Sequence, residues 1–146
     1  MTNIISVTST ITLGLLSGSL TLEAFVLVPF WRTLKPDEFF AMHRRVGPQL
    51  FRYFAPLTTA AVALPVVAAF VGRHGGHSGR SWTAAVLALV VLAFFPLFFQ
   101  RANEALAARS LADSELRWAL QRWARYHTGR TLLALVAFGF SAAALT

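Results

Sequence analysis

The side chains best able to do chemistry are a few polar groups inside otherwise apolar segments. Glu23 is the only charged residue among the first 31. A carboxylate at membrane depth is energetically costly, so it is usually paired or functional. We predict that His43, Asn103 and His127 lie at a similar depth in the other apolar segments. Together these residues would form one polar site close to one face of a membrane.

Glu23, His43 and His127 could together bind a metal ion. Two imidazoles and one carboxylate that leave coordination positions open suit non-haem iron, and imidazole-rich sites also suit copper. The sequence has no compact H-x-x-x-H or E-x-x-H spacing, so such a site depends on the helices that bring the three side chains together. An iron or copper site is one interpretation, and a metal-free site is the other.

A metal-free site would use acid–base chemistry. Glu23 or His127 would act as the general base, and Arg130 would stabilise an anionic oxygen of the substrate. Helical spacing places Trp123, His127 and Arg130 on one face at the start of the last apolar segment. The end of the third apolar segment offers amide side chains on one face. The predicted substrate-binding residues lie on these two faces, namely Asn103, Gln100 and Trp123.

The same residues also have structural interpretations. Glu23 could pair with Arg130 or Arg44 and hold the helices together. His43 could face solvent, and His127 could be a hydrogen-bonded structural residue. The alternative function is therefore non-enzymatic. It would be a small carrier, a metal- or proton-handling protein, or an accessory subunit, with Glu23 in an ion pair.

Hydrophobic elements must position these residues. The chain has 146 residues, of which 56% are hydrophobic and 13% are charged, whereas soluble domains are about 25% charged. The absence of cysteine excludes disulfides and thiolate metal sites. The net charge of +7 comes from basic residues beside apolar segments. We therefore expect contact with the headgroups of a lipid bilayer, and no nucleic acid partner.

Four apolar segments are long enough to cross a membrane, which takes roughly 20 mostly apolar residues. They cover residues 4–30, 49–71, 82–99 and 123–145. The sequence thus predicts an all-α fold, an integral membrane four-helix bundle that forms a single domain over residues 1–146.

Two short motifs concern helix boundaries and packing. Residues 35–38 read Lys-Pro-Asp-Glu, which is typical of a helix start. They predict a short amphipathic helix over 37–46 that lies at the membrane surface and ends at residues 47–48. Gly14 and Gly18 form a G-x-x-x-G motif, which permits close helix contact within one chain or between the chains of a homo-oligomer.

The charge distribution predicts the orientation. Segments 31–52 and 101–125 each carry five basic residues, against two in segment 73–80 and none in the N-terminal tail. The excess of positive charge on cytoplasmic connections places 31–48 and 101–122 in the cytoplasm. The prediction is a multi-pass protein of the inner cell membrane with both termini outside.

Several short motifs carry a resemblance to a known family. They are F-V-L-V-P at 25–29, F-F-A-M-H-R-R-V at 39–46, N-E-A-L at 103–106, and W-A-R-Y-H-T-G-R at 123–130. The last one fits the pattern W-x-x-x-[N/H]-x-x-R, which is the most specific of them. In these motifs the chain resembles the small four-span membrane proteins that include the anthrone oxygenases, over nearly its whole length.

The resemblance implies a four-helix membrane bundle that oxidises a reduced polycyclic phenol with dioxygen in polyketide biosynthesis. Asn103, Trp123, His127 and Arg130 match the family pattern. Many relatives have Asn where His127 stands, which points either to a metal site that relatives lack or to a different substrate. We predict a membrane oxygenase or oxidase that acts with dioxygen on a hydrophobic aromatic small molecule, anthrone- or polyphenol-like.

Overall fold

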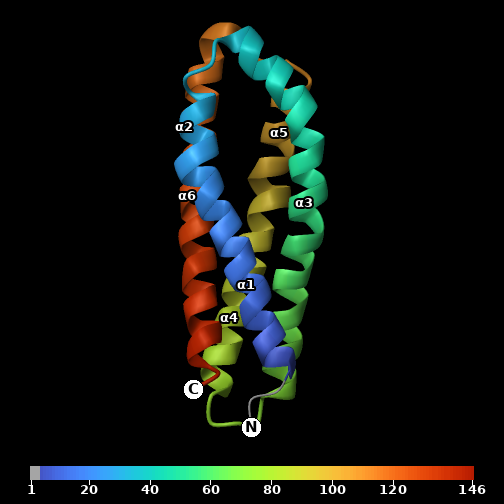
Figure 1. Ribbon diagram of the computed structural model, residues 1–146, viewed down its shortest axis with the longest axis vertical. Helices are drawn as coiled ribbons and strands as arrows, with labels where there is room; N and C mark the ends of the chain where they lie inside the picture. Colours follow the sequence, from blue (N-terminus) through green and yellow to red (C-terminus); the bar gives the residue numbers. More distant parts are fainter. Residues whose placement is uncertain (1–3) are drawn as a thin grey trace.

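The computed structural model describes residues 4–146, which form four long helical rods (Figure 1). The first rod joins α1 (Ile4–Leu22), η1 (Glu23–Leu27) and α2 (Val28–Trp31), and the second is α3 (Pro36–Val71). The third joins α4 (Ser78–Phe94), η2 (Phe95–Phe99) and α5 (Gln100–Ala107), and the fourth is α6 (Asp113–Ala143). The two η segments are π-helical. The predicted all-α class is confirmed.

Consecutive rods run in opposite directions and close into a ring, in which α6 packs against both α4 and α1. The start of α1, the C-terminus and the turn 72–77 lie at one end, which we call the terminus end (Figure 1). The turns 32–35 and 108–112 lie at the other end, here called the basic end. The predicted orientation requires this grouping of termini and connections, whereas the side of the membrane that each end faces stays a prediction.

Three rods are long and apolar enough to cross a membrane by length and composition, namely Ile4–Trp31, Pro36–Val71 and Ser78–Ala107. Large apolar side chains point outward from them, for example Phe25 and Leu97, and such faces suit contact with lipid. α6 is not among the three rods. Its apolar part after Arg130 covers only residues 131–143, about 20 Å of helix. The structure is therefore compatible with a multi-pass membrane protein, and the fourth crossing is not established by composition.

The start signal before α3 works as predicted. The helix begins at Pro36, and the Glu38 carboxylate accepts a hydrogen bond of 3.0 Å from the Lys35 backbone N–H. The third and fourth rods are longer than their predicted spans, because the third continues to Ala107 and α6 already begins at Asp113.

The predicted separate surface helix over 37–46 is wrong. α3 runs through Pro48 without a break. A proline inside a helix removes one backbone N–H and strains the preceding turn, but tertiary packing can offset this cost. Here Phe39, Phe40 and His43 bury their side chains in the bundle, which keeps the first turns of α3 helical, although they tilt relative to the rest of the helix (Figure 1).

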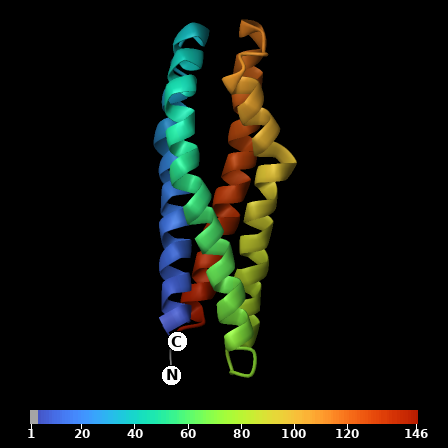
Figure 2. The same cartoon turned by 90° about the vertical axis from the view of Figure 1, so that its right-hand side faces the viewer.

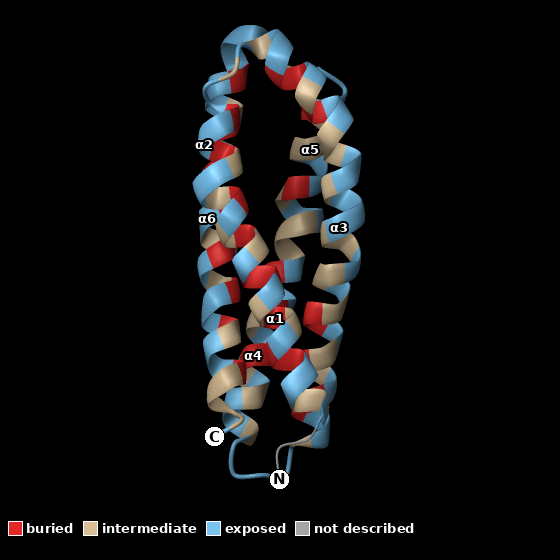
Figure 3. Ribbon diagram, viewed as in Figure 1, coloured by how far each residue is buried: buried red, intermediate tan, exposed pale blue. Residues whose placement is uncertain are grey.

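The bundle core has two parts with different side chains, and most outward faces are exposed (Figure 3). The part toward the terminus end consists of small and aliphatic residues: Leu13, Leu16, Leu20, Ala61, Val62, Ala88, Val91, Ala134 and Ala137. The part toward the basic end contains the large rings of Trp31, Phe39, Phe40, Phe99 and Trp123. Alanines let helix backbones approach closely, whereas the rings keep them apart. Beyond the aliphatic part of the core the ribbons of α3 and the third rod accordingly diverge (Figure 2), and α5 contacts α3 again closer to the basic end.

The two glycines of the G-x-x-x-G motif have different surroundings. A Cβ on Gly14 would lie 3.1 Å from the ring of Phe138 on α6, whereas nothing lies within 4 Å of one on Gly18. We expect Gly14→Ala to cost about 1 kcal/mol through overpacking. Gly18→Ala should instead add about 0.5 kcal/mol, because alanine favours a helix. Equilibrium unfolding in detergent micelles checks this, and equal effects of the two substitutions would contradict a tight contact at Gly14.

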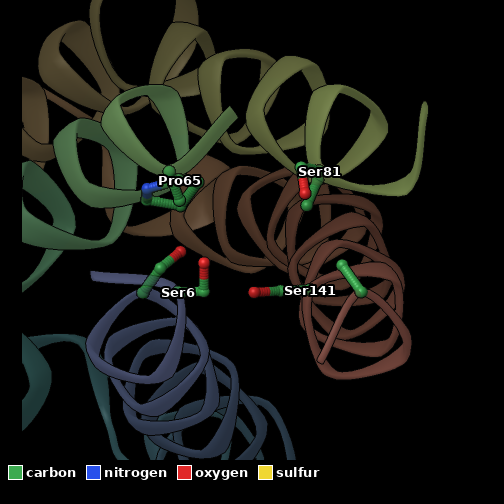
Figure 4. Close-up of a pocket in the computed structure, with 8 residues that line it drawn as sticks. Ser6, Pro65, Ser81 and Ser141 are labelled. Atoms are coloured by element: carbon green, nitrogen blue, oxygen red, sulfur yellow. The ribbon is translucent and has the colours of Figure 1, made fainter. Parts of the chain in front are cut away.

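A small polar pocket lies toward the terminus end, where Ser6, Ser81 and Ser141 surround it (Figure 4). Next to it, the hydroxyls of Thr10 and Ser141 share a hydrogen bond of 2.8 Å that joins α1 to α6. The pocket has a volume of about 10 Å³, which is close to the space that a single water molecule needs. A site for an organic molecule must therefore lie elsewhere.

Candidate functional site

A much larger cavity, of about 730 Å³, lies toward the basic end. α3 forms one wall, and α4, η2 and α5 form the opposite wall. The first rod and α6 contribute four side chains, namely Glu23, Trp31, Trp123 and Arg130. Small-molecule sites typically enclose roughly 300–1,000 Å³, so this cavity is large enough for a multi-ring organic molecule.

Glu23 lies at the first position of the π-helical segment η1. Hydrogen bonds there span five residues, as from the Val28 N–H to the Glu23 carbonyl. Such wide turns occur frequently at functional sites. The Glu23 side chain is only 6% exposed and lines the cavity together with Trp31, which follows the π segment.

Two basic side chains of α6 approach the Glu23 carboxylate. Glu23 Oε2 lies 3.8 Å from Arg130 Nη2 and 3.7 Å from His127 Nε2. Both distances exceed an ordinary hydrogen bond, so the contact is electrostatic at this separation. The structure thus brings together the three residues that the sequence analysis named as catalytic candidates.

His127 uses both ring nitrogens within the protein. Nε2 lies 3.0 Å from the Leu20 carbonyl oxygen, and Nδ1 lies 3.2 Å from Arg130 Nη2. A carbonyl only accepts hydrogen bonds and a guanidinium only donates them. His127 therefore donates through Nε2 and accepts through Nδ1, which defines the neutral tautomer. It is 1% exposed and is not among the described residues that line the cavity, so it supports Arg130 from behind.

Arg130 places its charge at the cavity wall. Its guanidinium carbon lies 4.3 Å from the centre of the Phe99 ring, a cation–π contact. Within residues 4–146 the guanidinium of Arg130 makes one hydrogen bond, the one to His127, and the buried Nε atom of Arg130 has no partner. A guanidinium has five N–H donors, so Arg130 keeps donor capacity for an oxygen of a bound molecule.

Aromatic rings surround the charged pair. Trp123 stacks on His127 with centroids 4.8 Å apart, and it makes T-shaped contacts with Trp31 at 5.5 Å and with Phe99 at 5.2 Å between centroids. The indole N–H of Trp123 donates to Asn103 Oδ1 at 2.9 Å, which joins α6 to α5. The cavity therefore has a rigid aromatic wall that suits the face of a flat ring system.

The other predicted site residues line the same cavity at different places. His43 is buried on α3 and stacks on Phe39 with centroids 5.5 Å apart. Gln100 is exposed at the rim, where its amide donates to Glu104 at 3.3 Å. The sequence analysis predicted a single layer of polar groups. The structure instead has a buried cluster around Glu23 and a more exposed polar rim at Gln100.

The donor groups do not fit a three-ligand metal site. Within the described residues no three His, Cys, Asp or Glu side chains are grouped so that they could hold a metal ion. Both nitrogens of His127 are also engaged in hydrogen bonds. Glu23, His43 and His127 are therefore not assembled as ligands in this arrangement, and bound iron or copper stays a prediction.

Sequence reasoning did not identify several parts of the cavity wall. Trp31 and Phe99 were not predicted to line the site, because aromatic residues at the ends of membrane spans usually face lipid or the protein core. The Leu20 carbonyl was not predicted as a partner of His127, because every residue type has the same backbone acceptor and the sequence pattern cannot single one out. The two π segments could have been suspected from Pro29 and Pro96, which lie close to or within them.

Comparison with known proteins supports the predicted resemblance. A family model described as anthrone oxygenase matches residues 43–140, which is well over half of the chain. The match includes His127 and Arg130 but not Glu23. No curated protein and no solved structure gives a significant match. The chain belongs to the anthrone oxygenase family.

Proposed function

We propose that this protein is a membrane oxygenase that oxidises an anthrone-like polycyclic phenol with dioxygen. The observation that carries the proposal is the pair Glu23 and Arg130, 3.8 Å apart, on the wall of a cavity of about 730 Å³ with aromatic sides. The family supports the type of reaction. The size and lining of the cavity support a flat, multi-ring substrate.

In the proposed reaction a ring methylene of the substrate becomes a carbonyl. The Glu23 carboxylate accepts a proton from the substrate, while Arg130 donates N–H groups to its phenolic oxygen and stabilises the anion. The carbanion then reacts with dioxygen. The carbon loses two hydrogens and four electrons and gains one oxygen atom, and the second oxygen atom leaves as water.

Other residues around the cavity would bind the substrate or hold Arg130 in position. Trp123 would cover one face of the substrate, with its ring fixed by Asn103. Gln100 would contact the substrate at the rim. His127 acts through Arg130, whose guanidinium it orients, and is therefore a positioning residue. Iron or copper is not needed for any of these steps.

We further propose that all four rods cross the inner membrane with the basic end in the cytoplasm. α6 would then leave its charged first half among the headgroups, where its arginines contact anionic lipid. The cavity would lie in the inner leaflet, within reach of hydrophobic molecules dissolved there.

Oxygen uptake tests the proposed reaction. Protein in lipid vesicles is mixed with an anthrone, and the rate of vesicles alone is subtracted. We expect one dioxygen consumed per quinone formed, and a loss of roughly 100-fold in Glu23→Gln because the base is gone. Glu115→Gln, exposed at the start of α6 and outside the cavity lining, is the matched control and should stay active, because glutamine can still accept the hydrogen bond from the Ala112 N–H. No protein-dependent uptake across a panel of anthrones and polyphenols would overturn the oxygenase, and metal analysis of active protein tests the iron or copper prediction.

A further inference from the structure

The exposed border of the cavity lies on one seam of the bundle. The lining residues from the first rod and α6 are buried or nearly so. Among the described residues that line the cavity, the exposed ones all lie on α3 or the third rod: Arg44, Pro48, Phe51, Thr59, Leu92, Gln100, Glu104 and Ala107. The mouth of the cavity therefore runs between these two rods, where Figure 2 shows the ribbons diverging.

The sequences of the two rods account for this divergence. α3 contains Pro48 and Pro56, and the third rod contains Pro96 within the π-helical segment η2. Prolines and π turns are the usual causes of bends in helices. Ala61 of α3 and Ala88 of α4 belong to the core toward the terminus end, so the rods are close there, and α5 contacts α3 again toward the basic end; the opening lies between these two contacts.

A single ring pair spans the mouth at its apolar part. Phe51 of α3 and Phe95 of η2 have ring centroids 6.1 Å apart, and both line the cavity. Phe51 is 57% exposed, so its ring has room to turn. Rotation of exposed side chains takes picoseconds to nanoseconds, and the pair can therefore open without movement of the helices.

The mouth faces lipid just below the charged groups of the basic end. Phe95 lies six residues before Arg101, about 9 Å along the helix, and the neighbouring Leu97 is 79% exposed. A phenolic ring system concentrates at this depth, since its apolar body prefers acyl chains and its hydroxyl prefers the headgroup region.

We propose that Phe51 and Phe95 form a gate through which a flat phenolic aromatic molecule passes sideways from the lipid leaflet into the cavity. The inference rests on the proposed function, because it assigns the access route to that same site. Molecules that partition into the bilayer reach the Glu23–Arg130 pair through the gate.

Cross-linking tests the gate, because the chain has no native cysteine. Phe51→Cys and Phe95→Cys are combined and joined by a short bismaleimide in vesicles. The matched control joins the same two rods near the terminus end through Phe70→Cys and Trp82→Cys, whose native rings lie 4.8 Å apart.

Binding is followed without turnover. In both proteins Trp118 is replaced by Phe, and Trp82 is replaced by Phe or by the control cysteine, so that the two remaining tryptophans are the cavity-lining ones. A hydroxyanthraquinone added to the vesicles should quench their fluorescence as it fills the cavity. We expect cross-linking at positions 51 and 95 to slow quenching by about tenfold or more, because a locked ring pair closes the route into the cavity, and the control cross-link to change it less than about twofold.

The outcomes separate the gate from the proposed function. Equally fast quenching with and without the cross-link at 51 and 95 overturns the gate alone. Slowed quenching in a protein that takes up no oxygen supports the gate and overturns the oxygenase. If the probe does not quench the protein even before cross-linking, the cavity is not the binding site and both proposals fail.

Discussion

Replacing Arg130 with methionine is expected to lower the free energy of unfolding by roughly 3–5 kcal/mol, the range found when one partner of a buried ion pair is removed. The Glu23 side chain is 6% exposed and would lose the cation 3.8 Å away. His127 Nδ1 would lose its hydrogen-bond donor, and Phe99 its cation–π contact. Methionine preserves most of the length and apolar volume of arginine, so lost packing explains little of this effect.

A double-mutant cycle isolates the pair. Glu23→Gln combined with Arg130→Met should cost less than the sum of the two single substitutions, by roughly 1–3 kcal/mol. Equilibrium unfolding in mixed micelles, followed by tryptophan fluorescence, measures all four proteins. Arg52→Met removes an exposed arginine of α3 and should change stability by less than about 0.5 kcal/mol. Additive losses would show that Glu23 and Arg130 are not energetically coupled.

The sequence was sufficient to predict the helices and to identify Glu23 as a candidate site residue. Glu23 stands out because no other charge occurs in the first rod, and membrane physics makes an isolated carboxylate significant. The start of α3 was also predictable, because its proline and acidic side chains act locally.

Helix interruptions were harder to predict because distant contacts decide them. Pro48 suggested an end to the helix, but the buried rings of Phe39 and Phe40 keep the chain before it helical, so that α3 continues through it. The π segments change the helical period, so the 3.6-residue spacing used before Glu23 no longer holds after it. This is why Trp31 could not be placed on the cavity wall from spacing alone.

His127 shows why the arrangement of the site could not be predicted fully from the sequence. A histidine near a carboxylate and an arginine is compatible with a ligand, a base or a structural group. The choice depends on the Leu20 carbonyl, a backbone atom on another helix that occupies Nε2. Only the assembled bundle shows that His127 lies behind the cavity wall while Glu23 and Arg130 line it.

Two substitutions of His127 should separate its two hydrogen bonds. The amide oxygen of asparagine can replace Nδ1 as the acceptor for Arg130, whereas the longer glutamine places its amide nearer Nε2 and can donate to the Leu20 carbonyl. If Arg130 must be held in place, His127→Gln should lower the kcat for oxygen uptake roughly 100-fold, the effect of misplacing a reacting group. His127→Asn should stay within about tenfold of the unchanged protein.

The comparison is informative because each variant keeps one hydrogen bond and loses the other. We therefore expect their free energies of unfolding to agree within about 1 kcal/mol, so that stability cannot explain a large difference in activity. The KM for the anthrone should change much less than kcat, since His127 does not touch the substrate and Arg130 acts on the charge that develops during the reaction. An asparagine variant as inactive as the glutamine variant, at equal stability, would show that the bond from Arg130 to Nδ1 does not govern the rate.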